Sequence, residues 1–124
     1  MSFLPFSGVV IHGQKYGRKL GYPTANLDIS ATDTRCAPGV YAATAWFCDK
    51  SYQSALIVNG ELDSIEVHLF DYHGDDFYDS HLRVLPIKKV SDMTKFDSES
   101  ALKDKIDADV RLIQEVFEEG EREK

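Results

Sequence analysis

The sequence predicts a mainly β fold, a small antiparallel barrel or sandwich that is completed by one C-terminal α-helix. Short runs of apolar residues between Val9 and Val90 alternate with turn sequences, in the period-two pattern of half-buried strands. From Asp97 onward the apolar period lengthens to nearly four, which is typical of an amphipathic helix. Because barrel closure removes exposed strand edges, we favour a barrel over a sandwich.

Length and composition predict one globular domain. The chain has 124 residues, of which 43% are hydrophobic, and a formal net charge of −7. We expect a single domain over residues 1–124, with 118–124 as a frayed charged tail, in a soluble, cytoplasmic monomer. The acidic balance argues against duplex DNA and anionic membranes as partners. Cys36 and Cys48 are interpreted as reduced thiols.

The expected extended segments lie between turn sequences. Val40, Ala42, Thr44 and Trp46 alternate with Tyr41, Ala43, Ala45 and Phe47, which predicts a strand covered on both faces. Residues 30–38 and 48–51 are turn-like, and Asn59-Gly60 is a strong hairpin signal. Pro86 favours an edge or a bulge in the last strand. The segments are 9–11, 27–29, 39–47, 52–58, 64–72 and 81–90.

One segment carries a candidate chemical group. In 64–72, Ile65, Val67 and Leu69 alternate with polar positions, so Glu66 and His68 should point away from the apolar face. Most carboxylates on the polar face of a strand are simply solvated, and that reading stays open here. The histidines and cysteines lack zinc-ligand spacing, so we predict no zinc site and a structural role for His68.

The C-terminal segment predicts an amphipathic helix. Leu102, Ile106, Val110, Ile113 and Phe117 form one apolar stripe, and we interpret the stripe as core packing. Asp97 or Ser98 is available as its N-cap.

The N-terminal segment 8–26 is a candidate anion site. Three β-branched residues lead into glycines at 13, 17 and 21, and Lys15, Arg18 and Lys19 add three cations. Glycine lets the backbone N–H groups come close to a ligand, and nearby cations add positive charge. Both features suit a polyphosphate. Pro23 stiffens the following turn, where Thr24 and Asn26 offer neutral oxygens to a hard cation. The same residues are equally compatible with ordinary turns that hydrogen-bond their own backbone.

Four ordered stretches resemble riboflavin kinases. They are the glycine loop that ends in Pro23-Thr24-Ala25-Asn26, then Pro38-Gly39-Val40-Tyr41, then Glu66-Val67-His68 leading to Asp76-Phe77-Tyr78, and finally Lys95-Phe96-Asp97-Ser98. The resemblance covers roughly residues 8–117. It implies a six-stranded antiparallel Greek-key barrel with a C-terminal helix.

The resemblance also implies an activity, the transfer of the γ-phosphoryl group of ATP to the 5′-hydroxyl of riboflavin, giving FMN and ADP. Glu66 would be the catalytic base, and it could face the Thr24–Asn26 turn across a barrel mouth. Thr24 and Asn26 would hold Mg²⁺. The implied nucleotide-binding residues are Gly13, Lys15, Gly17, Gly21, Pro23, Thr24 and Asn26.

Departures from the family pattern leave an alternative open. Residues 56–60, Asp79 and Ser91 differ from what riboflavin kinases usually carry near the flavin. The alternative is a catalytically impaired flavin- or nucleotide-binding protein of the same fold. A third hypothesis, a barrel that binds single-stranded nucleic acid, is disfavoured by the net charge.

Overall fold

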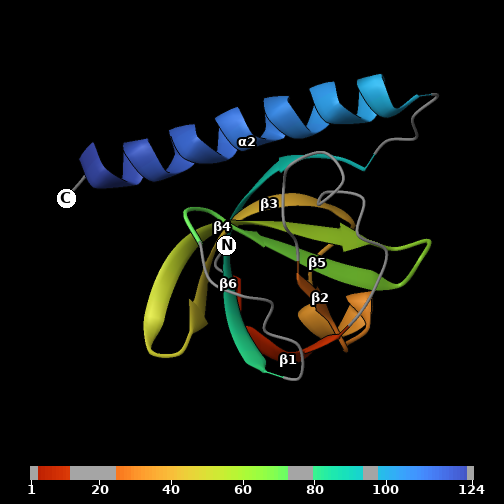
Figure 1. The fold of residues 1–124 in the computed structure, drawn as a ribbon, viewed down its shortest axis with the longest axis vertical. Coiled ribbons are helices and arrows are strands. Elements are labelled where there is room, and N and C mark those ends of the chain that lie inside the picture. The colour runs from red at the N-terminus through yellow and green to blue at the C-terminus, as the bar shows by residue number, and fades with distance from the viewer. Residues whose placement is uncertain (1–2, 12–24, 73–79, 94–97, 123–124) are drawn as a thin grey trace.

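Six strands close into an antiparallel barrel in the part of the chain that the computed structural model describes, residues 3–11, 25–72, 80–93 and 98–122. The order around the barrel is β1-β2-β5-β4-β3-β6, and strands β3 to β6 form a Greek key. The predicted barrel with a C-terminal helix is therefore confirmed (Figure 1). The strands are β1 (Phe6–Ile11), β2 (Ala25–Leu27), β3 (Gly39–Phe47), β4 (Lys50–Asn59), β5 (Ser64–Leu69) and β6 (His81–Ser91).

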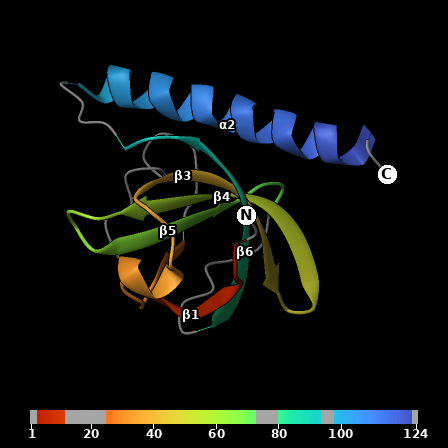
Figure 2. The same ribbon diagram turned by 180° about the vertical axis from the view of Figure 1, so that it is seen from behind.

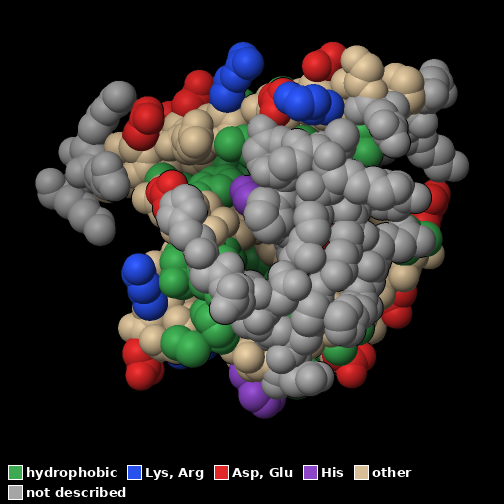
Figure 3. Space-filling model, in the orientation of Figure 1, with side chains coloured by type: hydrophobic (Ala, Val, Ile, Leu, Met, Phe, Trp, Pro, Cys, Tyr) green, Lys and Arg blue, Asp and Glu red, His purple; other side chains and the backbone are tan. Residues whose placement is uncertain are grey.

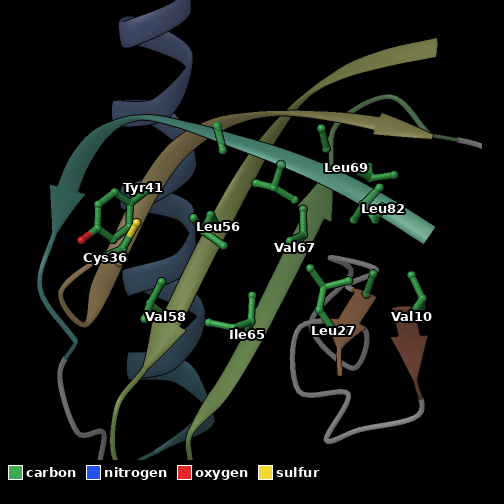
Figure 4. Packing of buried hydrophobic residues seen from close by; sticks show 14 of the residues in the cluster. Val10, Leu27, Cys36, Tyr41, Leu56, Val58, Ile65, Val67, Leu69 and Leu82 are labelled. Atoms are coloured by element: carbon green, nitrogen blue, oxygen red, sulfur yellow. The ribbon is translucent and has the colours of Figure 1, made fainter. Parts of the chain in front are cut away.

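The barrel interior is filled by apolar side chains that come from all six strands. Leu56, Ile65, Val67 and Leu82 are each fully buried there. Figure 4 shows these side chains directed toward one another between the strands. Since they occupy alternate strand positions, the residues between them point outward.

The 24-residue helix α2 (Glu99–Arg122) lies across the outside of the barrel and contacts β3, β4 and β6 (Figures 1 and 2). Beneath it is a second apolar cluster, which we call the outer cluster. Its buried members are Val40, Ala42, Ala55 and Ile113, and its partly buried members are Ile57, Phe70, Val90, Met93, Val116 and Phe117. The apolar stripe ends at Phe117, but the helix continues through Arg122, into the segment expected to be a frayed tail.

A polar contact accompanies the outer cluster. Lys105 of α2 donates a hydrogen bond to the Ser91 Oγ of β6 at 2.6 Å and forms an ion pair with Asp109. Asp109 is buried although it is charged. A buried charge is costly unless it is paired, and Asp109 has Lys105 of the same helix as its partner. The hydrogen bond from Lys105 to Ser91 links the helix to β6.

The connections refine the sequence predictions. β3 has the predicted bounds, but the β3–β4 hairpin is tighter than predicted, with Phe47 paired to Lys50 and only Cys48 and Asp49 between them. Residues 31–34, within a segment predicted as turn, form the 3₁₀ helix η1 (Ala31–Thr34), which a capping box from Ser30 stabilises. β5 ends at Leu69, earlier than predicted.

Three further predictions concern the helix cap, the last strand and the cysteines. Ser98 caps α2, since its Oγ accepts a hydrogen bond from the Ala101 N–H at 3.1 Å. β6 is continuous, and its pairing with β3 shifts register between Ala42 and Ala43, next to Pro86. The predicted bulge is therefore confirmed. The described cysteines, buried Cys36 and exposed Cys48, are both free thiols.

Candidate functional site

Asn26 and Glu66 are direct neighbours on the outer face of the barrel. They are paired in the ladder between β2 and β5, and directly paired residues project their side chains from the same face. Their chain neighbours Ala25, Leu27, Ile65 and Val67 all point into the core. In such pairs the Cβ atoms are about 4.5–5.5 Å apart. The two polar groups are therefore placed to act on one ligand.

The pair belongs to a row of residues that crosses every strand. Successive ladders connect Ile11 to Asn26, Asn26 to Glu66, Glu66 to Ile57, Ile57 to Val40 and Val40 to Ser91. We call this the outer row. One end holds the polar pair, the middle belongs to the outer cluster, and Ser91 at the other end contacts Lys105 of α2. The helix therefore lies over the middle and the Ser91 end of the row, and the polar pair is not part of the cluster beneath it.

Burial gives the Glu66 carboxyl an unusual proton affinity. Loss of solvation raises its pKa above the ordinary value, because the charged form is the one that water stabilises. A carboxylate with a raised pKa is a stronger base near neutral pH, which is the property that a general base needs. Glu66 thus differs from the carboxylates on the polar faces of strands, most of which are solvated.

Asn26 is a buried amide, with 8% of the residue exposed. Within the described residues its side chain forms no hydrogen bond, although buried polar groups normally do. Its amide oxygen is a suitable ligand for Mg²⁺, which binds few protein oxygens and keeps several waters or phosphate oxygens. The residue therefore fits the predicted metal role, while the described part of the chain holds no cluster of three His, Cys, Asp or Glu side chains.

All of the other predicted ligands lie outside the described residues. These are Gly13, Lys15, Gly17, Gly21, Pro23 and Thr24. The described flanks still locate where their segment is attached: Ile11 precedes it and pairs with Asn26, and Ala25 follows it. The two described flanks, Ile11 and Ala25, therefore lie at the polar end of the outer row.

The expected proximity of Glu66 and Asn26 holds, but the geometry differs from the prediction. The two residues do not face each other across a barrel mouth; they lie side by side on adjacent strands. His68 has the predicted outward position, and its ring contacts Phe70 at 5.1 Å between centroids. The sequence did not predict that Ile57 pairs with Glu66, since that pairing depends on the register between β4 and β5.

Hydrophobic side chains also reach the surface between α2 and the β3–β4 hairpin, as Figure 3 shows, while charged side chains lie along α2. Near the hairpin, Tyr72 makes edge-to-face contacts with Phe47 and Tyr52, at 6.0 and 5.6 Å between centroids. These rings pack against the barrel core. We interpret them as closing that end of the barrel.

The family comparison identifies the class of domain to which this barrel belongs. The family model described as flavokinase, riboflavin kinase, matches residues 2–117. The chain therefore belongs to the riboflavin kinase family.

Individual relatives agree with this membership. A bifunctional riboflavin kinase/FMN adenylyltransferase from Buchnera aphidicola (subspecies Acyrthosiphon pisum) is 34% identical, over 90% of this chain and 38% of its own length. The RNA-binding riboflavin kinase RibR of Bacillus subtilis is 30% identical, over 90% of this chain and 50% of its own. The chain thus spans about two fifths to one half of the length of these relatives.

Solved structures share the fold. Riboflavin kinase from Trypanosoma brucei superposes with a TM-score of 0.67 at 25% identity, covering 94% of this chain and 79% of its own. A structure described as a macrolide-efflux protein from Streptococcus pneumoniae gives a TM-score of 0.76 at 33% identity, over 90% of this chain and 38% of its own.

Among the described residues, no helix combines the length and the apolar character that crossing a membrane requires.

Proposed function

We propose that this chain is a single riboflavin kinase domain, which transfers the γ-phosphoryl group of ATP to the 5′-hydroxyl of riboflavin and releases FMN and ADP. The observation that carries the proposal is the pairing of Glu66 with Asn26 on the outer face of the barrel. Family membership supports the choice of substrates.

In this mechanism Glu66 accepts a hydrogen bond from the 5′-hydroxyl of riboflavin and takes its proton as the new bond to phosphorus forms. Its raised pKa suits that role. The carboxylate also orients the hydroxyl for attack in line with the leaving ADP oxygen. A general base of this kind contributes about 10²–10⁴ to the rate.

Asn26 and Thr24 are the proposed ligands of Mg²⁺. When bound, this ion neutralises charge on the β and γ phosphate oxygens. Asn26 offers its amide oxygen from the strand position next to Glu66, which keeps metal and base within one site. Gly13, Lys15, Gly17, Gly21 and Pro23 are proposed to shape the loop that receives the phosphates.

The direct test is FMN formation, followed by chromatography, from riboflavin, ATP and Mg²⁺ with the purified protein. Glu66→Gln should lower kcat about 10²- to 10⁴-fold while leaving ATP affinity nearly unchanged. Glu115→Gln, an exposed glutamate on α2, serves as the control and should behave as wild type. Full activity of Glu66→Gln would mean that another group acts as the base.

Asn26→Ala tests the metal role separately. We expect lower turnover and a higher Mg²⁺ concentration for half-maximal rate, since one protein ligand is lost. An unchanged Mg²⁺ requirement would remove Asn26 from the metal site.

The alternative is a protein of this fold that binds flavin or nucleotide without turnover. Calorimetric binding of riboflavin or ADP by a wild-type protein that forms no FMN would establish it. We propose small molecules as the ligands, and a monomer. The RNA-binding description of the Bacillus subtilis relative makes an oligonucleotide titration a useful additional control, for which we expect no binding.

A further inference from the structure

Ser64 lies on the same outer face of β5 as Glu66, two residues before it. Ile65 between them is fully buried and points into the core, as Figure 4 shows. The register agrees, because Ser64 pairs with Asn59 of β4, and Val58 beside Asn59 is an inner residue. Two residues of a strand cover about 6.6 Å, so one small molecule can reach both the serine hydroxyl and the carboxylate.

The Ser64 hydroxyl has no hydrogen-bond partner among the residues that the structure describes, although Ser64 is partly buried. In the same part of the chain, the carboxylate of Glu66 and the amide of Asn26 have none either. Polar groups that are shielded from water normally find a partner. The unused hydrogen-bonding capacity of these three neighbouring side chains therefore indicates that ligands complete this part of the outer face.

Two other polar neighbours are already engaged. His68, which follows Glu66 on the same face, contacts another aromatic ring at 5.1 Å between centroids. The side-chain oxygen of Asn59 accepts a hydrogen bond from the Leu62 N–H at 3.1 Å, within the turn between β4 and β5. On this side of the carboxylate, the hydroxyl of Ser64 is therefore the group that is left for a ligand.

The proposed substrate has the chemistry that this hydroxyl requires. The ribityl chain of riboflavin carries hydroxyl groups on consecutive carbon atoms, and its terminal 5′-hydroxyl is the one that Glu66 is proposed to deprotonate. A chain held at that end brings its inner hydroxyls beside the same strand face. A serine hydroxyl both donates and accepts hydrogen bonds, so it suits a polyol whose hydroxyls do the same.

We propose that Ser64 is a substrate-binding residue: it hydrogen-bonds an inner hydroxyl of the ribityl chain, at the 2′, 3′ or 4′ position, and so selects a polyol over a plain alcohol as phosphoryl acceptor. This inference rests on the proposed kinase function and names how that site recognises its acceptor. A second point of attachment holds the 5′-hydroxyl at Glu66. An acceptor without inner hydroxyls is disfavoured because it leaves the Ser64 side chain unpaired.

The test combines a change in the protein with a change in the substrate. Ser64→Ala removes the hydroxyl from the protein. A riboflavin analogue with a 5-hydroxypentyl chain lacks the inner hydroxyls and keeps the reacting one. Quenching of flavin fluorescence measures the binding of each acceptor to each protein, and chromatography measures phosphorylation. The combinations give the coupling between Ser64 and the inner hydroxyls.

We expect Ser64→Ala to bind riboflavin about 3- to 10-fold more weakly, the equivalent of one neutral hydrogen bond, and to raise KM for riboflavin accordingly. The analogue should bind equally to wild type and to Ser64→Ala. Ser64→Thr keeps a hydroxyl and should restore the preference for riboflavin. In both variants, KM for ATP and the Mg²⁺ concentration for half-maximal rate should stay unchanged.

Ser51→Ala is the matched control. Ser51 is an exposed serine of β4 that pairs with Trp46 of β3, at the hairpin end of that strand. This variant should bind both acceptors as wild type does, and a loss of riboflavin binding equal to that of Ser64→Ala would remove the assignment to Ser64.

Three other results would overturn the proposal. Equal losses for riboflavin and the analogue in Ser64→Ala would mean that the serine supports the structure, and no loss for either would mean that it makes no contact with the acceptor. A changed Mg²⁺ requirement would assign Ser64 to the metal. Failure of the proposed function is distinguishable: a wild type that binds riboflavin without forming FMN leaves the binding comparison intact, whereas one that binds no riboflavin overturns both proposals.

Discussion

The inner and outer faces of the barrel carry different chemistry on the same strands. On β5, Ile65 and Val67 are fully buried inside the barrel, while Glu66 between them points outward. On β4, Leu56 is an inner residue and its neighbour Ile57 an outer one. The alternation of a strand therefore separates residues that hold the fold from residues that define the site, one position apart.

Leu56→Ala and Ile57→Ala compare the two faces directly. The inner substitution leaves a cavity in a closed core and should lower the free energy of unfolding by about 2–5 kcal/mol. The outer one should cost less, because Ile57 is partly exposed. Urea unfolding measures both. A larger cost for Ile57→Ala would break the assignment of stability to the inner face.

Asp109→Ala tests how firmly the outer face holds α2. It leaves the partly buried Lys105 ammonium without Asp109, while its hydrogen bond to the Ser91 Oγ at 2.6 Å remains. We expect a loss of about 1–3 kcal/mol in unfolding free energy. Lys103→Ala is the control: Lys103 pairs with Asp107 at 3.1 Å and its side chain is 52% exposed, so about 0.5 kcal/mol or less should be lost.

The raised pKa of Glu66 predicts a pH dependence of stability. Above the ordinary value of 4.5 the unfolded chain has released the proton that the folded protein still holds, so the folded state binds more protons. Stability should fall as pH rises from that value through the raised pKa. Urea unfolding at several pH values should show this decline in wild type and a weaker one in Glu66→Gln. Parallel curves would contradict a buried carboxyl at this position.

The β3–β4 hairpin gives the smallest expected effect. Cys48 and Asp49 have φ of 51° and 64°, a conformation that Asn-Gly adopts more easily. Cys48→Asn with Asp49→Gly should raise stability by up to about 1 kcal/mol, seen as a higher Tm. Asp63→Gly is the contrast: Asp63 also has a positive φ, of 48°, but its Oδ1 accepts a hydrogen bond from the Ala31 N–H at 2.7 Å. That variant should gain nothing.

Local signals in the sequence predict the fold well. β3 has its predicted bounds because turn residues flank it, and the bulge follows from the missing N–H of Pro86. The hairpin was predicted too wide, since Cys48 and Asp49 are uncommon in a two-residue turn with positive φ. The 3₁₀ helix η1 depends on the cap by Ser30 and on Asp63, which is distant in sequence.

The candidate site was predictable only in part. Glu66 and Asn26 stand out through the family motifs, whereas their adjacency depends on long-range register. The sequence marks Ser91 as a departure from the family pattern; in the structure its Oγ accepts a hydrogen bond from the Lys105 ammonium of α2. Residue 79 and the glycine loop lie outside the described ranges, so their roles stay predictions.

The outer row makes the site sensitive to chain length in a specific way. Deleting or inserting one residue within β5 exchanges its two faces, which would turn the Glu66 carboxylate into the apolar interior and expose its apolar neighbours. Changes of length in the turn at residues 60–63 leave the pairing of Asn59 with Ser64 as the starting point of the ladder. Homologous chains should therefore keep the length of β5 constant.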